Sequence, residues 1–185
     1  MACALIPLAD GFEDLEAISI VDVLRRGGVE VVTASVHDAL GVTSAHGISM
    51  KADALLEDAA SADYDAIVLP GGGPGTENLK NSGTLYRLLR RQNSEGRLLC
   101  AICAAPTVLV DAGVLEPELH VTCYPTCQME LDRPWAAAPV VADGNVITAQ
   151  APGSAMLFAL VVLQALTGEP AARKVARGLV TDVLD

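Results

Sequence analysis

The stretch Leu98–Pro106 (LLCAICAAP) is the part of the sequence that most directly indicates the fold. Its first five residues are apolar and suit a strand covered on both faces of a sheet. The small residues and the proline that follow favour the start of a helix. The stretch therefore predicts a buried strand over 98–102, a helix from 104 to about 112, and Cys103 on the sharp turn between them.

Further apolar runs lie on the N-terminal side of this stretch. Residues 2–8, 29–35 and 66–70 read as strands, and a helix over 13–26 joins the first two. A strand–helix–strand unit of this kind requires a right-handed crossover and a parallel sheet. In the helix, Leu15, Ile18 and Val21 give an apolar stripe, which Ile20 and Leu24 widen. The irregular segment 37–62 is expected to hold a small hairpin.

The rest of the chain continues the alternation of strands and helices. We expect helices over 84–93, 153–166 and 171–179, and strands over 120–124 and 140–150, with a turn at 143–145. The pattern predicts a doubly wound, mostly parallel α/β sheet with helices on both faces. In such a fold the functional crevice lies beyond the carboxyl ends of the strands.

Composition narrows the class of protein. The 185 residues are 51% hydrophobic and 19% charged, which suits one domain over residues 1–185. A formal net charge of −11 argues against nucleic acid and anionic membranes as partners. Apolar runs stay well below the roughly 18 residues of a membrane span, and no secretion signal is evident. Five irregularly spaced cysteines then suggest free thiols and a cytoplasmic protein.

Cys103 is the strongest candidate for chemistry. A helix N-terminus stabilises a thiolate and is expected to lower the thiol pKa. The glycine-rich run at 71–75 and the N–H of Ala104 supply backbone donors that can face a developing anion. Two alternatives stay open: Cys103 is a small buried core residue, and the glycines only mark a tight turn.

Four motifs together resemble the ThiJ/PfpI superfamily, in particular the branch that contains DJ-one and YajL. They are Asp10–Glu16 (DGFEDLE), Val68–Gly72 (VLPGG), Ala101–Pro106 (AICAAP) and Ala151–Ser154 (APGS), in family order. The resemblance covers residues 2 to about 179. It implies a flavodoxin-like fold of the class I glutamine amidotransferase type, a homodimer, and a reactive cysteine on an elbow.

The resemblance also implies roles for individual residues. Cys103 matches the readily oxidised nucleophile, Glu16 the acid that contacts it, and the backbone N–H groups of Gly72 and Ala104 the oxyanion site. A carboxyl beside a thiolate in an apolar crevice is expected to have a raised pKa and to stay protonated. The alternative for Glu16 is an ordinary solvent-facing helix glutamate.

Other pocket candidates mark departures from the family pattern. Tyr124 stands where many relatives have a histidine, and tyrosine does not act as a base near neutrality. His46 replaces a pocket arginine, which predicts weaker, pH-dependent anion binding. Arg26 belongs to a basic pair near the family's dimer interface, and Pro152 lies in the fourth motif. Ala104 replaces the histidine of the protease branch, so proteolysis is not expected.

The remaining cysteines suggest redox chemistry more than metal binding. Cys100 and Cys103 have CxxC spacing, and Cys123 and Cys127 form a second pair. Cys123 is a candidate resolving thiol for an oxidised Cys103. A zinc site is disfavoured because Cys100 lies within an apolar strand. We therefore expect neither a metal nor a cofactor.

Two functions of different classes follow from the resemblance. The first is a cofactor-free glyoxalase or deglycase that acts on methylglyoxal, glyoxal or their protein adducts through Cys103 and Glu16. The second is an oxidative-stress sensor and redox-regulated chaperone whose Cys103 is oxidised to sulfinate without turnover. A dimeric interaction module with a vestigial cysteine is the third possibility.

Overall fold

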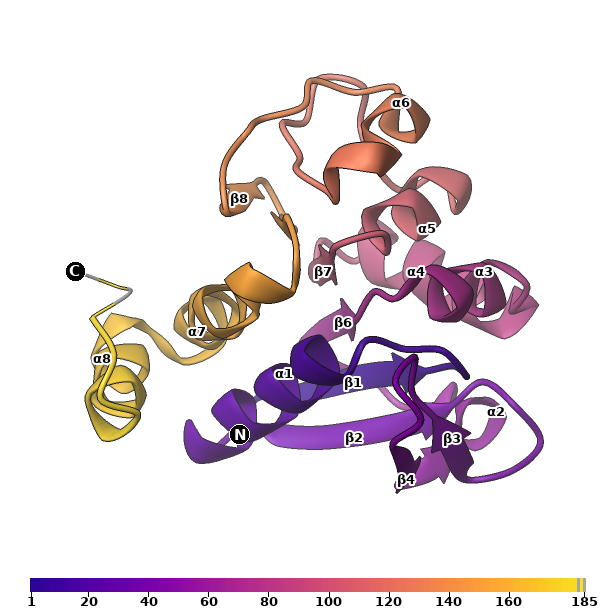
Figure 1. Ribbon diagram of the computed structural model, residues 1–185, viewed down its shortest axis with the longest axis horizontal. Coiled ribbons are helices and arrows are strands. Elements are labelled where there is room, and N and C mark those ends of the chain that lie inside the picture. Colours follow the sequence, from indigo (N-terminus) through magenta and orange to yellow (C-terminus); the bar gives the residue numbers. More distant parts are fainter. Residues whose placement is uncertain (183, 185) are drawn as a thin grey trace.

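The computed structural model describes residues 1–182 and Leu184. Within these residues a central sheet has the strand order β5-β2-β1-β6-β7-β9-β8, and every neighbouring pair is parallel except β8 and β9 (Figure 1). The doubly wound, mostly parallel fold predicted from the sequence is thus confirmed. The strands are β1 (Cys3–Leu8), β2 (Glu30–Ser35), β5 (Ala54–Leu55), β6 (Ala66–Leu69), β7 (Leu98–Ile102), β8 (Val140–Asp143) and β9 (Val146–Ala149).

Helices cover both faces of this sheet, and each face has its own apolar core (Figure 1). One core contains side chains of α1 (Asp14–Arg26), α7 (Ala155–Thr167) and α8 (Glu169–Gly178). The other contains side chains of α2 (Leu56–Ala59), α3 (Gly73–Lys80), α4 (Gly83–Ser94), α5 (Pro106–Asp111) and α6 (Gln128–Leu131). The central strands β1, β6 and β7 are apolar along their length because both of their faces are covered.

The segment between β2 and β5 forms the expected hairpin. It consists of β3 (Gly41–Thr43) and β4 (Ser49–Lys51), which pair in antiparallel register. Backbone hydrogen bonds tie the hairpin to the loop after β1: Gly11 N donates to Thr43 O at 2.7 Å, and Ala45 N to Phe12 O at 2.8 Å. The hairpin turn is thereby held against the start of α1.

The buried face of α1 differs from the predicted stripe. Ile20 and Leu24 are buried as expected, but Leu15 and Ile18 are 63% and 51% exposed. The inward face instead passes through Glu16, whose side chain is fully buried. The predicted stripe was wrong at Leu15 and Ile18, whereas the inward position of Glu16 agrees with its expected contact with Cys103.

Two local predictions also need correction. Residues 120–124 do not form a strand: Val121 makes one isolated bridge to Trp135, and a 3-10 turn follows at Pro125–Cys127. The glycine-rich run at 71–75, expected to be a loop or a tight turn, is partly helical, because α3 begins at Gly73 and leaves only residues 70–72 between β6 and the helix. In the part of the chain that the structure describes, we find no helix long and apolar enough to cross a bilayer.

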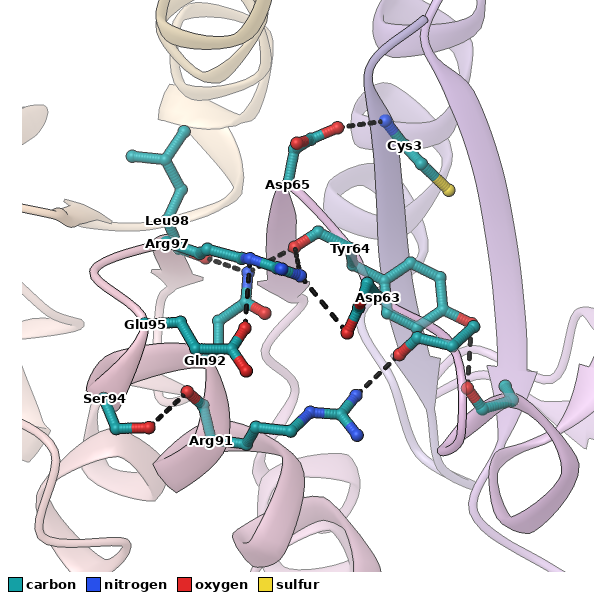
Figure 2. A network of polar contacts seen from close by, with 12 residues as sticks. Cys3, Asp63, Tyr64, Asp65, Arg91, Gln92, Ser94, Glu95, Arg97 and Leu98 are labelled. Carbon is teal, nitrogen blue, oxygen red and sulfur yellow. Dashed lines mark hydrogen bonds and ion pairs between the residues drawn. The ribbon is translucent and has the colours of Figure 1, made fainter.

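A network of polar contacts joins the elements at the amino-terminal ends of the central strands (Figure 2). Gln92 in α4 is buried, and its Nε2 donates to the carbonyls of Tyr64 and Leu98 at 3.0 and 3.2 Å. Arg97 also donates to the Tyr64 carbonyl, and Asp65 accepts from the backbone N–H of Cys3. These contacts join α4, β1, β6 and β7 at the end of the strands opposite Cys103.

Replacing Gln92 with alanine is expected to lower the free energy of unfolding by about 1–3 kcal/mol, because the buried Tyr64 carbonyl and the partly buried Leu98 carbonyl each lose a donor and a cavity forms. Urea unfolding followed by circular dichroism measures this change. Exposed Gln128 provides the matched control, and its alanine variant is expected to change stability by less than about 0.5 kcal/mol. Equal effects of the two variants would show that the network does not hold this edge.

Candidate active site

Cys103 lies directly after β7 in a backbone conformation that is rare for a residue with a side chain. Its φ is 65°, in the left-handed region. Hydrogen bonds on both sides hold it there: Cys103 N donates to Ala149 O at 2.9 Å, and Cys103 O accepts from Tyr124 N at 2.7 Å. The side chain is 8% exposed. The elbow predicted from the sequence is therefore present, and it is fixed by its neighbours.

Glu16 points inward from the first turn of α1 to the same place. Its Oε2 accepts a hydrogen bond from Gly71 N at 2.7 Å. Its Oε1 is buried with no nitrogen or oxygen partner among the described residues, and the Cys103 thiol lies beside the carboxyl. The solvent-facing alternative for Glu16 is thus wrong. A proton on Oε1 would satisfy this oxygen by donation to sulfur.

Burial raises the pKa of Glu16 to about 7, and the charge of Glu13 acts in the same direction. The hydrogen bonds from Gly71 and Cys103 oppose the rise. The carboxyl therefore populates both its neutral and its charged form near neutrality, which suits a group that takes up and returns a proton.

The thiol of Cys103 behaves differently from the sequence expectation. Burial, together with the neighbouring Glu16 carboxylate, raises the pKa of Cys103 to about 12. The backbone N–H groups of Gly72 and Ala104 face the sulfur and act in the predicted, lowering direction. Desolvation outweighs them, so the expectation of a lowered thiol pKa was wrong. Before any reaction, Cys103 is therefore a neutral thiol, and it lies next to the Glu16 carboxyl in the same buried site.

Two glycines allow this close approach. A Cβ on Gly71 would lie 2.7 Å from the Cβ of Cys103 and 2.8 Å from Glu16 Oε2. Gly72 has a φ of 94°, and a Cβ there would lie 2.3 Å from the Gly11 carbonyl. Sequence reasoning assigned Gly72 to the oxyanion site and included Gly71 among the backbone donors, but it did not predict that Gly71 N binds Glu16. The signal was the paired glycine directly after a buried strand.

The hairpin adds a second group of polar side chains next to this pair. Asp14 accepts hydrogen bonds from Ser44 Oγ and from His46 Nδ1, the latter at 2.6 Å. These bonds outweigh burial and lower the pKa of Asp14. Glu13 precedes Asp14 at the N-cap, and its Oε2 accepts from Glu16 N at 2.8 Å. His46 thus lies at the start of the helix that carries Glu16.

Glu13, Asp14 and His46 bring three potential ligand atoms within 4.8 Å of one another. Both Asp14 oxygens already accept hydrogen bonds from the hairpin, and Glu13 caps the helix. Since the side chains satisfy each other, we assign no metal to this group. No cysteine belongs to such a cluster within the described ranges, 1–182 and 184.

The DJ-1/PfpI family matches residues 2–165. The chain belongs to this family. It is 42% identical over 179 residues to protein DJ-1 homolog B of Arabidopsis thaliana, covering 95% of this chain and 41% of the plant protein, so it spans less than half of that relative. It is 39% identical to protein dj-1beta of Drosophila melanogaster, with 95% of each chain covered. A Caenorhabditis elegans relative named glutathione-independent glyoxalase DJR-1.2 is 35% identical over 90% of this chain and 89% of its own.

Solved structures of DJ-1 proteins share the flavodoxin-like fold of this DJ-1/PfpI chain. Oxidised Toxoplasma gondii DJ-1 has a TM-score of 0.94 at 35% identity, covering 98% of this chain and 100% of that one. Drosophila melanogaster DJ-1beta also has a TM-score of 0.94, at 38% identity, covering 97% and 98% of the two chains. The predicted family and fold are therefore confirmed.

The other candidate residues of this DJ-1/PfpI protein lie at different distances from the elbow. Tyr124 is 42% exposed and adjoins Cys103 through its backbone. Pro152 begins the 3-10 turn Pro152–Ser154, three residues after the Ala149 carbonyl that binds Cys103 N. Arg26 lies ten residues from Glu16, about 15 Å along α1, and pairs with Asp22. Within one chain Arg26 is therefore remote from the site.

Cys123 is adjacent to Tyr124, but its side chain belongs to a different apolar core from that of Cys103. Its side chain is fully buried in the core that contains α4 and α5, whereas Cys103 belongs to the core that contains α1 and α7. Its sulfur lies 3.2 Å from the Tyr124 carbonyl, and burial raises its pKa to about 12. A role as resolving thiol would require the segment after residue 120 to rearrange.

Proposed function

We propose that this protein converts small 2-oxoaldehydes such as methylglyoxal into 2-hydroxy acids without a cofactor. The observation that carries the proposal is the buried pair of Cys103 and Glu16 under two backbone N–H groups. The family membership supports it, as does the relative named as a glutathione-independent glyoxalase. Cys103 is 8% exposed, which favours a free small aldehyde over an adduct carried by a protein.

The residues suggest a sequence of steps that needs no oxidant. The sulfur of Cys103 adds to the aldehyde carbon, and the thiol proton passes to the former carbonyl oxygen, giving a hemithioacetal. The N–H groups of Gly72 and Ala104 stabilise the negative oxygen as it forms. Glu16, as a carboxylate, then takes the proton from this carbon and returns it to the adjacent carbon, while the hydroxyl proton passes to the oxygen of the second carbonyl, which leaves a thioester of the hydroxy acid.

Water hydrolyses the thioester and regenerates the thiol, so the sum is aldehyde plus water to hydroxy acid. Lactate formation from methylglyoxal by the full chain, without glutathione, tests the proposal directly. A rate equal to the uncatalysed rate would contradict it. A lysyl or arginyl adduct of methylglyoxal, offered in parallel, tests the deglycase form of the same chemistry.

A second proposal is that Cys103 acts as an oxidative-stress sensor. The two backbone donors and a protonated Glu16 surround the sulfur, and such donors stabilise the oxygens of a sulfinate. The structural relative from Toxoplasma gondii is described as oxidised. In the chaperone form of this proposal, oxidation would expose an apolar surface, which increased binding of a hydrophobic dye would report.

Mild peroxide is expected to add two oxygens to Cys103 alone, as two peroxide molecules are reduced to water. Loss of the donor in Glu16→Ala is expected to slow the second addition severalfold. Intact mass and peptide mapping measure both changes. Oxygen distributed equally among Cys103 and the partly exposed Cys3 and Cys127 would contradict the sensor proposal.

We also propose a homodimer, as the family resemblance implies. The outward face of α1 carries Leu15 and Ile18, and Ile48 on the adjacent hairpin is 56% exposed. Exposed apolar side chains that gather on neighbouring elements are typical of an interface. In this arrangement α1 would contribute Glu16 to the site on one face and contacts with a second copy on the other.

Ile18→Asp is expected to shift the dimer toward monomer by at least about tenfold in dissociation constant, since an unpaired charge would be buried between the copies. Sedimentation velocity at several concentrations measures this shift. Met129→Asp, at a position that is 90% exposed on another surface, is the control and is expected to leave the dimer unchanged. A native chain that sediments as a monomer would contradict the proposed dimer.

A further inference from the structure

Lys80, the last residue of α3, lies among carboxylates from three helices. Its Nζ is 3.6 Å from Glu77 Oε1 in the same helix, 3.4 Å from Asp111 Oδ2 at the end of α5, and 3.4 Å from Glu130 Oε2 in α6. The lysine side chain is 17% exposed, whereas the three carboxylate side chains are 46% to 70% exposed. Lys80 is thus a partly buried cation that joins α3 to both α5 and α6.

The contacts also keep Lys80 charged. Burial lowers the pKa of Lys80, but the charges of its three carboxylate neighbours outweigh burial and raise the pKa above its ordinary 10.5. A single exposed ion pair contributes little, whereas one cation shared among several carboxylates forms a network. Loss of this cation would leave three negative charges facing one another. Their repulsion would push the ends of α5 and α6 away from α3.

The opposite ends of the same three segments lie at the active site. α3 begins directly after Gly72, whose N–H faces the Cys103 sulfur. Ala104, which supplies the second donor, lies two residues before the start of α5. The turn before α6 follows Tyr124, whose N–H donates to the Cys103 carbonyl at 2.7 Å. Each segment therefore runs from the active site to Lys80 or to one of its carboxylate neighbours.

Two of these helices are short and are bonded directly to the donor residues. α3 has 8 residues and α5 has 6, which correspond to lengths of about 12 and 9 Å. Thr76 N donates to the Gly72 carbonyl at 2.8 Å, and Thr107 N donates to the Ala104 carbonyl at 3.1 Å. A shift at the far end of either helix therefore moves a donor at the site. Misplacement of a catalytic group by about 1 Å costs up to about 10²-fold in rate.

The contact with Lys80 also orients α6. This helix has four residues, and Leu131 is the one among them that is buried. One apolar contact holds a helix against the core but does not set its direction. The ion pair between Glu130 and Lys80 supplies a second point of attachment. Through the turn at Pro125–Cys127, this attachment also holds Tyr124 at the elbow.

The carboxylates around Lys80 lie away from the surface that we assign to a second copy. α3, α5 and α6 pack against one face of the sheet, and α1 packs against the other (Figure 1). A substitution at Lys80 is therefore expected to leave the proposed homodimer intact.

We propose that Lys80 is a positioning residue that holds α3, α5 and α6 together and thereby aligns the backbone donors at Cys103. This role rests on the proposed function, because the same donors stabilise the negative oxygen that forms during turnover. Lys80 lies at the far end of α3 from the sulfur and acts on the reaction only through the helices. In the substrate-free protein, the same contacts keep the Tyr124 N–H bonded to the elbow.

Hydrogen exchange of the substrate-free protein, followed by NMR, tests this role. Lys80→Met keeps an unbranched side chain but removes the charge, and it is expected to speed exchange of the Tyr124 N–H at least about tenfold. Amides of the paired strands β1 and β2 are expected to keep their native exchange rates. Lys80→Arg keeps the cation and is expected to stay within about threefold of the native rate at Tyr124.

Two carboxylate variants separate the contact between helices from the contact within α3. Glu130→Gln removes the link to α6 and is expected to speed exchange at Tyr124 severalfold. Glu77→Gln is the matched control, because Glu77 contacts Lys80 from within the same helix and joins no second segment. Native exchange at Tyr124 in Lys80→Met, or equal acceleration in the two carboxylate variants, would overturn the role. Equal acceleration at Tyr124 and in the strands would also overturn it, since that result indicates a global loss of stability.

Turnover provides a second readout. Lys80→Met is expected to lower kcat for lactate formation by about tenfold and to change KM less than about twofold, because aligned donors act mainly in the transition state. Asp111→Asn is expected to lower kcat in the same way, by a smaller factor, and Lys80→Arg to retain it. Lys174→Met, at an exposed lysine on α8, is the control with native kcat.

A raised KM at unchanged kcat in Lys80→Met would contradict the alignment of the donors. The two experiments also keep this role separate from the proposed function. If the native protein formed no lactate, the proposed function would fail, and hydrogen exchange at Tyr124 would still decide whether Lys80 holds the three helices together.

Discussion

Cys103→Ala is expected to lower the rate of lactate formation from methylglyoxal by at least about 10³-fold. The remaining rate is the one that the backbone donors and Glu16 support without the thiol. The reason is that the variant removes the only atom that forms a covalent bond with the aldehyde in the proposed steps. Initial rates of lactate formation, at matched protein concentration, measure the change. Because the side chain is small and Ala is apolar, the fold is expected to remain intact.

Cys127→Ala is the matched control, since Cys127 is a partly exposed free cysteine outside the site. It is expected to retain native rates. If Cys103→Ala kept more than about a tenth of native turnover, covalent catalysis at this position would be wrong. If both variants lost activity equally, the thiols would share a role that the geometry of the elbow does not explain.

Glu16→Gln is expected to lower lactate formation by about 10²–10⁴-fold, because the amide keeps the shape of the side chain but does not accept and return a proton. Glu118→Gln, at an exposed position, is the control. Native turnover in Glu16→Gln would refute the proton-transfer role, even if Cys103 proved essential. The pH dependence of the native rate is expected to change near pH 7, where Glu16 titrates.

The same substitution is expected to increase stability above neutral pH. The pKa of Glu16 rises from 4.5 to about 7 on folding, so its neutral form is favoured in the folded state. Its contribution to stability is therefore present below about pH 4.5 and is lost as the pH rises through about 7. The difference in free energy of unfolding between Glu16→Gln and the native protein is therefore expected to shift in favour of the variant by up to about 3 kcal/mol when the pH is raised from 5 to 8. Urea unfolding at both pH values measures this gain.

The sheet was predictable because its central strands carry their own signal. β1, β6 and β7 are continuous apolar runs bounded by glycine or charged turns, and burial on both faces demands that composition. The segment 120–124 contains residues that favour strands, but among the described residues its one bridge partner is Trp135. Composition alone does not show whether a neighbouring strand is available, so that prediction failed.

The candidate site was predictable only in part. The elbow at Cys103 is a local pattern, and the family resemblance identified Glu16 and the two backbone donors. The attachment of the hairpin to α1 depends on contacts between Asp14 and residues about thirty positions later, which no local pattern encodes. Likewise, the high thiol pKa follows from burial, which depends on the packing of the whole site.

The left-handed backbone at Cys103 has a consequence for how this sequence diverges over evolutionary time. A side chain held in that region costs about 1–3 kcal/mol, whereas glycine adopts the same conformation freely. A lineage released from selection for the thiol would therefore gain stability by replacing it with glycine. Persistence of a side chain at position 103 across diverging lineages would thus be a sign of continuing selection on chemistry, readable without any assay.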